Sequence, residues 1–171
     1  MAHAPACTPA AALVAALALA LAACAGAPPR PYGPPNSDAP HAMHPLPGRR
    51  GRMVDTAASM LGQPYRFGGA APGGFDCSGL VVYAAAGAGV HVPRTAHEQL
   101  GFGEPIARGE VQAGDLIFMH LAHKELHVGI AIDGERFIHA PSTGGRVRID
   151  SLAAPPYARG YLSARRIFTV E

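Results

Sequence analysis

The chain has 171 residues, enough for one domain and an additional segment, and its composition is that of an ordinary soluble globular protein apart from abundant Ala, Gly and Pro. Its 14 Lys and Arg residues nearly balance 12 Asp and Glu residues, which gives a formal charge of +2. No basic run and no basic patch interleaved with aromatic residues is present, so we expect no nucleic-acid partner.

Residues 1–23 are predicted to be a lipoprotein signal peptide, because an apolar run from Ala10 to Ala23 is too short to span a bilayer comfortably. The run ends in Leu21-Ala22-Ala23-Cys24, which resembles a bacterial lipobox and implies cleavage before Cys24 and lipidation of that residue. The alternative is an ordinary secretory cleavage site with Cys24 incidental, and the lack of Lys and Arg in residues 1–8 departs from the usual signal. Ala25 resembles the sorting signal of outer-membrane lipoproteins, which implies an anchor on the periplasmic side of the cell envelope.

The mature chain is expected to keep one free thiol. Cys7 leaves with the signal peptide and Cys24 is capped by lipid, so Cys77 has no disulfide partner. In an exported protein, where disulfides are permitted, an unpaired cysteine is more often reactive than structural. Residues 24–48 are Pro-rich, nearly uncharged and without apolar periodicity, which predicts an extended tether with no fixed structure.

A single domain is predicted over residues 49–171. Helices are expected at 53–61, 76–86 and 95–100, and strands at 115–119, 127–132, 136–140, 146–150 and 164–170. Thr95-Ala96-His97-Glu98 fits a capping box that fixes the start of the third helix. Helices followed by adjacent strands predict an α+β domain in which N-terminal helices pack on a central antiparallel sheet of about five strands.

Cys77 is the candidate nucleophile. Asp76 suits the N-cap of a helix whose apolar residues recur at helical spacing from Leu80, and Gly87 is placed to end that helix. Cys77 then falls in the first turn, where unpaired N–H groups and the helix dipole favour a thiolate and lower the pKa of the thiol. The alternative is a buried cysteine that behaves as a small hydrophobic residue.

A thiol nucleophile needs a general base and a group that orients the base, and histidine is the usual base. Among nine histidines, His127 opens one predicted strand and His139 lies in the next. A two-residue turn at Asp133-Gly134 would put the two histidines on opposite faces of the sheet. A three-residue loop with a left-handed Gly134 and a bulge would put His127 directly opposite His139. Only the second register builds a site, so we predict it.

A competing hypothesis is a zinc site, because His120, His123 and His127 lie close together in the sequence. The segment is predicted to be a loop between strands, and a metal would take His127 away from the thiol. We therefore predict no metal site and no cofactor, and we expect His91 and His97 to face solvent.

Six blocks occur in order: Tyr65-Arg66-Phe67-Gly68-Gly69, Asp76-Cys77-Ser78-Gly79-Leu80, Pro93-Arg94-Thr95, Gly114-Asp115-Leu116-Ile117-Phe118, His127-Val128-Gly129-Ile130 and Phe137-Ile138-His139-Ala140. Together they resemble the NlpC-type papain-like cysteine peptidases that cut bacterial cell-wall peptides. The resemblance covers residues 53–166 and implies the papain-like NlpC-type fold. It also implies that Cys77 is the nucleophile, His127 the base, and His139 the orienting group that other papain-like enzymes supply as Asn or Asp.

The resemblance extends to residues around the nucleophile. Tyr65 matches a family tyrosine that would donate its phenol to the oxyanion, together with the backbone N–H of Cys77; the alternative is a ring that packs under the glycine loop. Ser78 is expected to be structural or to line the substrate site. Arg94 either contacts substrate carboxylates or is solvated.

The sequence thus predicts a cysteine endopeptidase that hydrolyses stem peptides or crosslinks of peptidoglycan, held at the membrane by an N-terminal lipid and monomeric. The alternatives are a catalytically idle peptidoglycan-binding module and an amidase or acyltransferase that uses the same Cys-His site. The loops at 102–110 and 121–126 are expected to decide which bond is cut.

Overall fold

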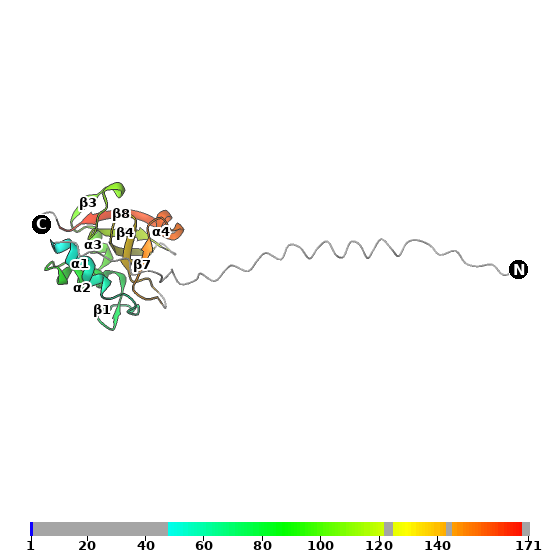
Figure 1. The fold of residues 1–171 in the computed structure, drawn as a ribbon, viewed down its shortest axis with the longest axis horizontal. Helices are drawn as coiled ribbons and strands as arrows, with labels where there is room; N and C mark the ends of the chain where they lie inside the picture. Colours follow the sequence, from blue (N-terminus) through cyan, green and yellow to red (C-terminus); the bar gives the residue numbers. More distant parts are fainter. Residues whose placement is uncertain (2–47, 122–124, 143–144, 169–171) are drawn as a thin grey trace. The chain divides into compact units, whose positions relative to one another are not determined.

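The structure is a computed structural model that describes residues 1, 48–121, 125–142 and 145–168. Its elements, labelled as in Figure 1, are α1 (Gly48–Ala58), β1 (Ala70–Ala71), β2 (Gly74–Phe75), α2 (Cys77–Gly87), α3 (Ala96–Leu100), β3 (Glu104–Ile106), the 3-10 helix η1 (Arg108–Glu110), β4 (Leu116–His120), β5 (Leu126–Ala131), β6 (Arg136–His139), β7 (Arg148–Ser151), α4 (Pro155–Gly160) and β8 (Tyr161–Arg166). Cys24, the signal peptide after Met1 and the predicted tether lie outside the described residues, except that Gly48, the last residue of the predicted tether, begins α1. Within those residues, no helix has the length and apolar character needed to cross a membrane.

Six strands form the main sheet in the order β3-β8-β4-β5-β6-β7, and every neighbouring pair is antiparallel. The α+β class is confirmed, but the sheet has one strand more than expected. The additional strand is β3, a three-residue edge strand that pairs with β8. Pro105 in its centre hides it from a search for strand patterns, and an edge is where a sheet tolerates proline.

The two faces of the sheet are covered by different elements. On one face, α1 and α2 pack side by side, and their apolar residues share a core with Phe118, Val128 and Ile138. On the other face, α4 contributes Tyr157 to a second core that includes Phe137. A strand's alternate residues point to opposite faces, so each strand supplies both cores.

Helix α2 begins where the sequence predicts and packs closely on its neighbours. Asp76 is its N-cap. A Cβ at Gly87 would lie 2.6 Å from Thr56 Oγ1, so this glycine lets α1 approach α2. Gly87 is still helical, and the left-handed residue after the helix is Gly89, with φ +74°. The helix nevertheless ends at Gly87, as the sequence predicts.

Several boundaries differ from prediction because local turns decide them. α1 starts at Gly48 and ends at Ala58, whereas the predicted helix spanned 53–61. β8 runs from Tyr161 to Arg166 and not over 164–170. The short helix α4, which begins with two prolines, was not predicted. Because α4 ends at Gly160, β8 begins directly after it, three residues before the predicted start of the strand.

Candidate active site

Cys77 is the first residue of α2, and the capping carboxylate in front of it holds the helix start. Asp76 Oδ1 accepts hydrogen bonds from the N–H of Gly79 at 2.6 Å and from the Ser78 hydroxyl at 3.2 Å. Asp76 Oδ2 accepts from the N–H of Gly68 at 3.0 Å. The cap thus joins the helix to the glycine loop that precedes it.

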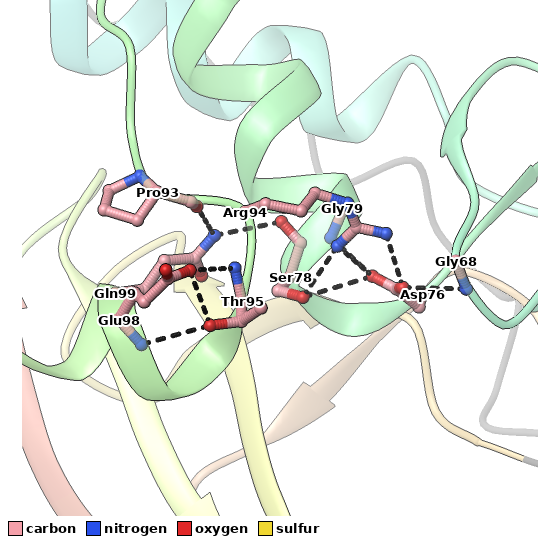
Figure 2. Close-up of polar contacts among 9 residues, drawn as sticks. All are labelled: Gly68, Asp76, Ser78, Gly79, Pro93, Arg94, Thr95, Glu98 and Gln99. Atoms are coloured by element: carbon pink, nitrogen blue, oxygen red, sulfur yellow. Dashed lines mark hydrogen bonds and ion pairs between the residues drawn. The ribbon is translucent and has the colours of Figure 1, made fainter.

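Arg94 completes this network (Figure 2). Its guanidinium donates to both oxygens of Asp76, at 3.0 and 2.6 Å, and to Ser78 Oγ at 3.0 Å. Burial alone raises the pKa of Asp76, but the donors from Arg94, Gly79 and Gly68 outweigh burial and hold that pKa below its usual range. Arg94 is therefore neither free for a substrate carboxylate nor simply solvated, because a bidentate pair occupies it.

The segment after Arg94 is fixed by the predicted capping box, which is confirmed. Thr95 Oγ1 accepts from the N–H of Glu98, and the Glu98 carboxylate accepts from the N–H of Thr95 at 3.1 Å. The next side chain, Gln99, is buried and donates to the carbonyl oxygens of Ser78 at 3.1 Å and of Pro93 at 2.8 Å (Figure 2). Helix α3 thereby holds the Arg94 segment against the start of α2.

The thiol of Cys77 does not have the low pKa that its helix position suggested. Burial raises the pKa of Cys77, and the nearby Asp76 carboxylate raises it further. Backbone N–H groups of Val128, Ser78 and Cys77 itself act in the opposite direction, without outweighing burial. The expectation that the helix start alone keeps this thiol ionised is therefore wrong, and a proton acceptor is needed.

His127 and His139 share a face of the sheet, but in neither of the two registers considered. Ala131 pairs with Phe137, so Gly129, and not His127, falls opposite His139. The turn explains the shift: Asp133 Oδ1 accepts from the N–H groups of Glu135 and Arg136 at 2.8 and 2.7 Å, and Gly134 is not left-handed. Hydrogen bonds to the Asp133 side chain, and not a left-handed conformation of Gly134, therefore shape this turn.

The rings meet diagonally across Gly129. A Cβ at Gly129 would lie 2.6 Å from Phe137 Cδ2 and 3.2 Å from His139 Cβ, so only glycine leaves this space open. His127 Nε2 lies 2.7 Å from His139 Nδ1, and the two rings are perpendicular. Both side chains are buried. The two imidazoles are therefore brought together, although by a register that the sequence did not reveal.

A third member of this chain, Asp150 of β7, was missed by the sequence analysis. Its Oδ2 lies 2.8 Å from His139 Nε2 and also accepts from Arg148 Nε at 2.7 Å and from the Tyr157 hydroxyl at 2.6 Å. Burial raises the pKa of Asp150, but these three donors bring it down to about 2. A signal was present, since strand alternation puts Arg148 and Asp150 on one face, and two charges in a strand next to a candidate site are unusual.

The protonation pattern follows from these contacts. Burial lowers the pKa of both histidines, that of His127 to about 3, so both rings are neutral. The ionised Asp150 can only accept, so His139 Nε2 carries a proton and Nδ1 is an acceptor. His127 Nε2 must then donate to His139, which leaves His127 Nδ1 as an unprotonated lone pair. This arrangement makes His127 able to accept a proton.

Cys77 and His127 line the same cavity of about 620 Å³, together with Tyr65, Ser78 and His97 and with the side chains of Phe67, Asp76, Leu121, Glu125, Leu126 and Ser142. In the described residues, no hydrogen bond joins the Cys77 sulfur to the His127 ring. Val128, next to His127, donates its N–H to the sulfur. The nucleophile helix and the base strand are thus in contact at this cavity.

Other predicted residues divide between this cavity and the rest of the surface. Tyr65 is half-buried in the wall, and its pKa is raised by burial and by the neighbouring Cys77. His91 and His97 are exposed as expected, but His97 also lines the cavity. Of the loops expected to choose the bond, 121–126 supplies lining residues, whereas 102–110 contains β3 at the sheet edge and supplies none within the described chain.

The zinc hypothesis lies partly outside the described residues, because His123 is not among them. Within the described part of the chain, no group of three or more His, Cys, Asp or Glu residues is arranged to hold a metal ion.

The chain is similar in sequence to known cell-wall endopeptidases. The chain is 42% identical over 115 residues to murein DD-endopeptidase MepH of Escherichia coli strain K12, a match that covers 64% of this chain and 42% of that protein. It is 34% identical over 121 residues to murein DD-endopeptidase MepS/murein LD-carboxypeptidase of the same strain, covering 70% of this chain and 64% of that protein. The chain therefore spans less than half the length of the first of these relatives.

Solved structures show the same fold. A crystal structure from Staphylococcus aureus subsp. aureus Mu50, of a protein similar to a lipoprotein of the NLP/P60 family, superposes with a TM-score of 0.64 at 35% identity, covering 71% of this chain and 42% of that one. The NlpC/p60 domain of peptidoglycan hydrolase SagA superposes with a TM-score of 0.60 at 31% identity, covering 68% of this chain and 97% of that one. Residues 62–166 match the NlpC/P60 family, so the chain belongs to that family.

Proposed function

We propose that this protein is a cysteine endopeptidase that hydrolyses peptide bonds in peptidoglycan. The observation that carries the proposal is the cavity that contains Cys77 and His127, with His127 backed by the buried chain of His139 and Asp150. A thiol that needs a proton acceptor and an imidazole with a free lone pair are the two parts of nucleophilic catalysis. The murein endopeptidases among the relatives support peptidoglycan as the substrate class.

In the proposed first step, the Cys77 sulfur attacks the scissile carbonyl as His127 Nδ1 takes the thiol proton. The imidazolium forms next to a neutral His139, whose other nitrogen donates to the ionised Asp150. Asp150 thus stabilises the new positive charge through one intervening ring. His139 and Asp150 are positioning residues, since they act through His127 and not on the substrate.

The carbonyl oxygen becomes an oxyanion, and we assign its stabilisation to the backbone N–H of Cys77 and the phenol of Tyr65. His127 returns its proton to the leaving amine, and the C–N bond breaks to give a thioester. Water then attacks the thioester with His127 again as base, which releases the carboxylic acid and restores the thiol. Ser78 lines the cavity while its hydroxyl is held by Asp76 and Arg94, so we assign it a structural role.

The proposal is tested by incubating the purified protein with peptidoglycan and identifying released fragments by mass spectrometry. Wild type is expected to release peptides with new amino and carboxyl ends, and Cys77→Ala to release none. His91→Ala serves as the matched control, because His91 is exposed and does not line the cavity. Cys77→Ala with wild-type release would contradict the mechanism.

The same experiment separates the two alternatives. A binding module would retain peptidoglycan in a pull-down and release no product. An amidase would instead free intact stem peptides from the sugar, and an acyltransferase would join the acyl group to an added amine. The intact set of Cys77, His127 and His139 disfavours a module without activity.

We further propose that Cys24 is lipidated and anchors the domain at the periplasmic face of the outer membrane, through the tether of residues 24–47. The support is the Leu21-Ala22-Ala23-Cys24 motif together with Ala25. Fractionation of cells that express wild type or Cys24→Ser tests this proposal. Wild type is expected in the outer-membrane fraction with a lipid-modified N-terminus by mass spectrometry, and Cys24→Ser in the soluble fraction. Equal distribution of the two proteins would contradict it.

A further inference from the structure

A second cavity, of about 530 Å³, adjoins the one that contains Cys77. The two cavities share Leu121, which follows β4, and Ser142, which follows β6. Beyond these two residues, the second cavity is lined by Arg148 of β7 and by Tyr157 and Arg159 of α4, among others. The two cavities are therefore adjacent at Leu121 and Ser142.

The second cavity is positively charged. Its described lining contains Arg148 and Arg159 and neither Asp nor Glu. The nearest carboxylate in the network already described, Asp150, accepts three hydrogen bonds and is paired with Arg148. Because that pair is neutral overall, the charge of Arg159 remains uncompensated.

The two arginines differ in how they are held. Arg148 donates from Nε to Asp150 and from Nη2 to the Tyr157 hydroxyl, at 2.7 and 3.0 Å. Arg159 is exposed, and in the described part of the chain its guanidinium has no hydrogen-bond or ion-pair partner. Its backbone is nevertheless fixed, because a Cβ on the next residue, Gly160, would collide with the carbonyl oxygen of His120. Arg159 is thus a free cation on a firmly packed element.

We propose that the second cavity is a subsite for a carboxylate of the substrate peptide, with Arg159 as its partner. The inference rests on the proposed function and adds to it the chemical group of the substrate that the second cavity would bind. Peptidoglycan peptides carry free carboxylates near their scissile bonds, and guanidinium is the side chain best suited to bind a carboxylate through two hydrogen bonds. The subsite would select acidic stem peptides over amidated ones.

The first test measures binding and does not depend on turnover. The full chain with Cys77→Ala is titrated with a crosslinked muropeptide dimer by calorimetry, and then with the same dimer after its carboxylates are converted to primary amides. We expect the acidic dimer to bind about tenfold more tightly, and Arg159→Gln to remove this preference. Arg159→Glu should favour the amidated dimer.

Arg52→Gln is the matched control, because Arg52 is an exposed residue of α1 that lines neither cavity. It removes the same charge and should keep the tenfold preference. Equal binding of the two dimers, no binding of either, or an equal loss of preference in Arg52→Gln and Arg159→Gln would each overturn the proposal. The last result would show a general charge effect.

Cleavage by proteins that retain Cys77 separates this inference from the proposed function. Arg159→Gln should lower kcat/KM for the acidic dimer about tenfold and leave the amidated dimer within twofold of wild type. An equal loss for both dimers would assign Arg159 a structural role and overturn the subsite. If no protein cleaves either dimer while the binding preference is present, the endopeptidase proposal fails and the subsite stands.

Discussion

The two sides of the active-site cavity are built in different ways. On the helix side, Cys77 is held by residues near it in sequence, since the cap at Asp76 bonds the N–H of Gly79 and the hydroxyl of Ser78. On the sheet side, His127 is held by His139, 12 residues further along the chain, and His139 in turn by Asp150, another 11 residues further, in two successive strands. One side depends on a local motif, and the other on strand register.

The two sides also differ in their charges. The helix side carries a partly buried, compensated ion pair, Asp76 with Arg94. The sheet side carries two buried neutral histidines, the second of which is hydrogen-bonded to the ionised Asp150. The helix side therefore sets the position of the sulfur, whereas the sheet side supplies the proton acceptor. The following predictions test that division.

The largest expected effect comes from removing either partner of the proton transfer. Cys77→Ala and His127→Ala should each lower kcat for muropeptide cleavage by at least about 1000-fold, because the thiol and its base act as one unit. The double variant should be no worse than either single variant. Single-turnover kinetics on one crosslinked dimer measures all three. Losses that multiply in the double variant would show that the two residues act separately.

A smaller loss of activity is expected from Asp150→Asn, which replaces the carboxylate that hydrogen-bonds His139. The amide can donate to His139 Nε2, which would reverse the tautomers of both histidines and protonate His127 Nδ1. We expect kcat to fall about 100-fold with the fold retained, since a wrong tautomer disables a base that remains in place. Tyr157→Phe is the matched control: it removes one donor to Asp150 but leaves the carboxylate, and it should keep most of the activity.

Sequence reasoning predicted the helix side because its signals are local. The cap at Asp76 and the capping box at Thr95 are both readable from a few adjacent letters, and both are confirmed. The pKa of Cys77 was not predictable in this way, because it depends on burial by segments distant in sequence. The position of Cys77 at a helix start indicates the direction of one contribution to its pKa, but not the net shift of that pKa.

The sheet side was predicted only in part. The pair His127 and His139 was identified, but the turn that sets the register is made by the Asp133 side chain, which pattern rules for glycine turns do not anticipate. Asp150 lies on a third strand, so its contact with His139 depends on a second register. Each further strand pair adds another register that has to be predicted, whereas a helix cap is formed by residues adjacent in sequence and depends on no register.

Gly129→Ala sharpens the comparison because it alters only the sheet side. The new methyl group would press on Phe137 Cδ2, 2.6 Å away, and on His139 Cβ. Overpacking of this kind costs about 1–3 kcal/mol, and we expect a loss of that size in the free energy of unfolding together with reduced activity. Chemical denaturation and kcat measure the two effects. Gly109→Ala is the control, because a Cβ at Gly109 meets nothing within 4 Å.

An effect of similar size, which appears only when the pH is lowered, is a pH dependence of stability that arises from the sheet side alone. The folded-state pKa of His127 is lowered to about 3, mainly by burial, whereas an unfolded histidine titrates near its ordinary value. Below that value the unfolded chain therefore binds a proton that the folded chain does not. Stability must fall as the pH drops from 7 to 5, by about 2 kcal/mol for this one residue.

Urea unfolding of wild type and His127→Gln at pH 7, 6 and 5 measures this contribution. The variant should lose about 2 kcal/mol of the pH dependence, while His91→Gln, which changes an exposed histidine, should retain all of it. The carboxylates on the helix side do not contribute in this window, because the pKa of Asp76 is lowered and its stabilisation disappears only at more acidic pH. An unchanged slope in His127→Gln would mean that His127 is not held neutral, and the contrast between the two sides of the cavity would be lost.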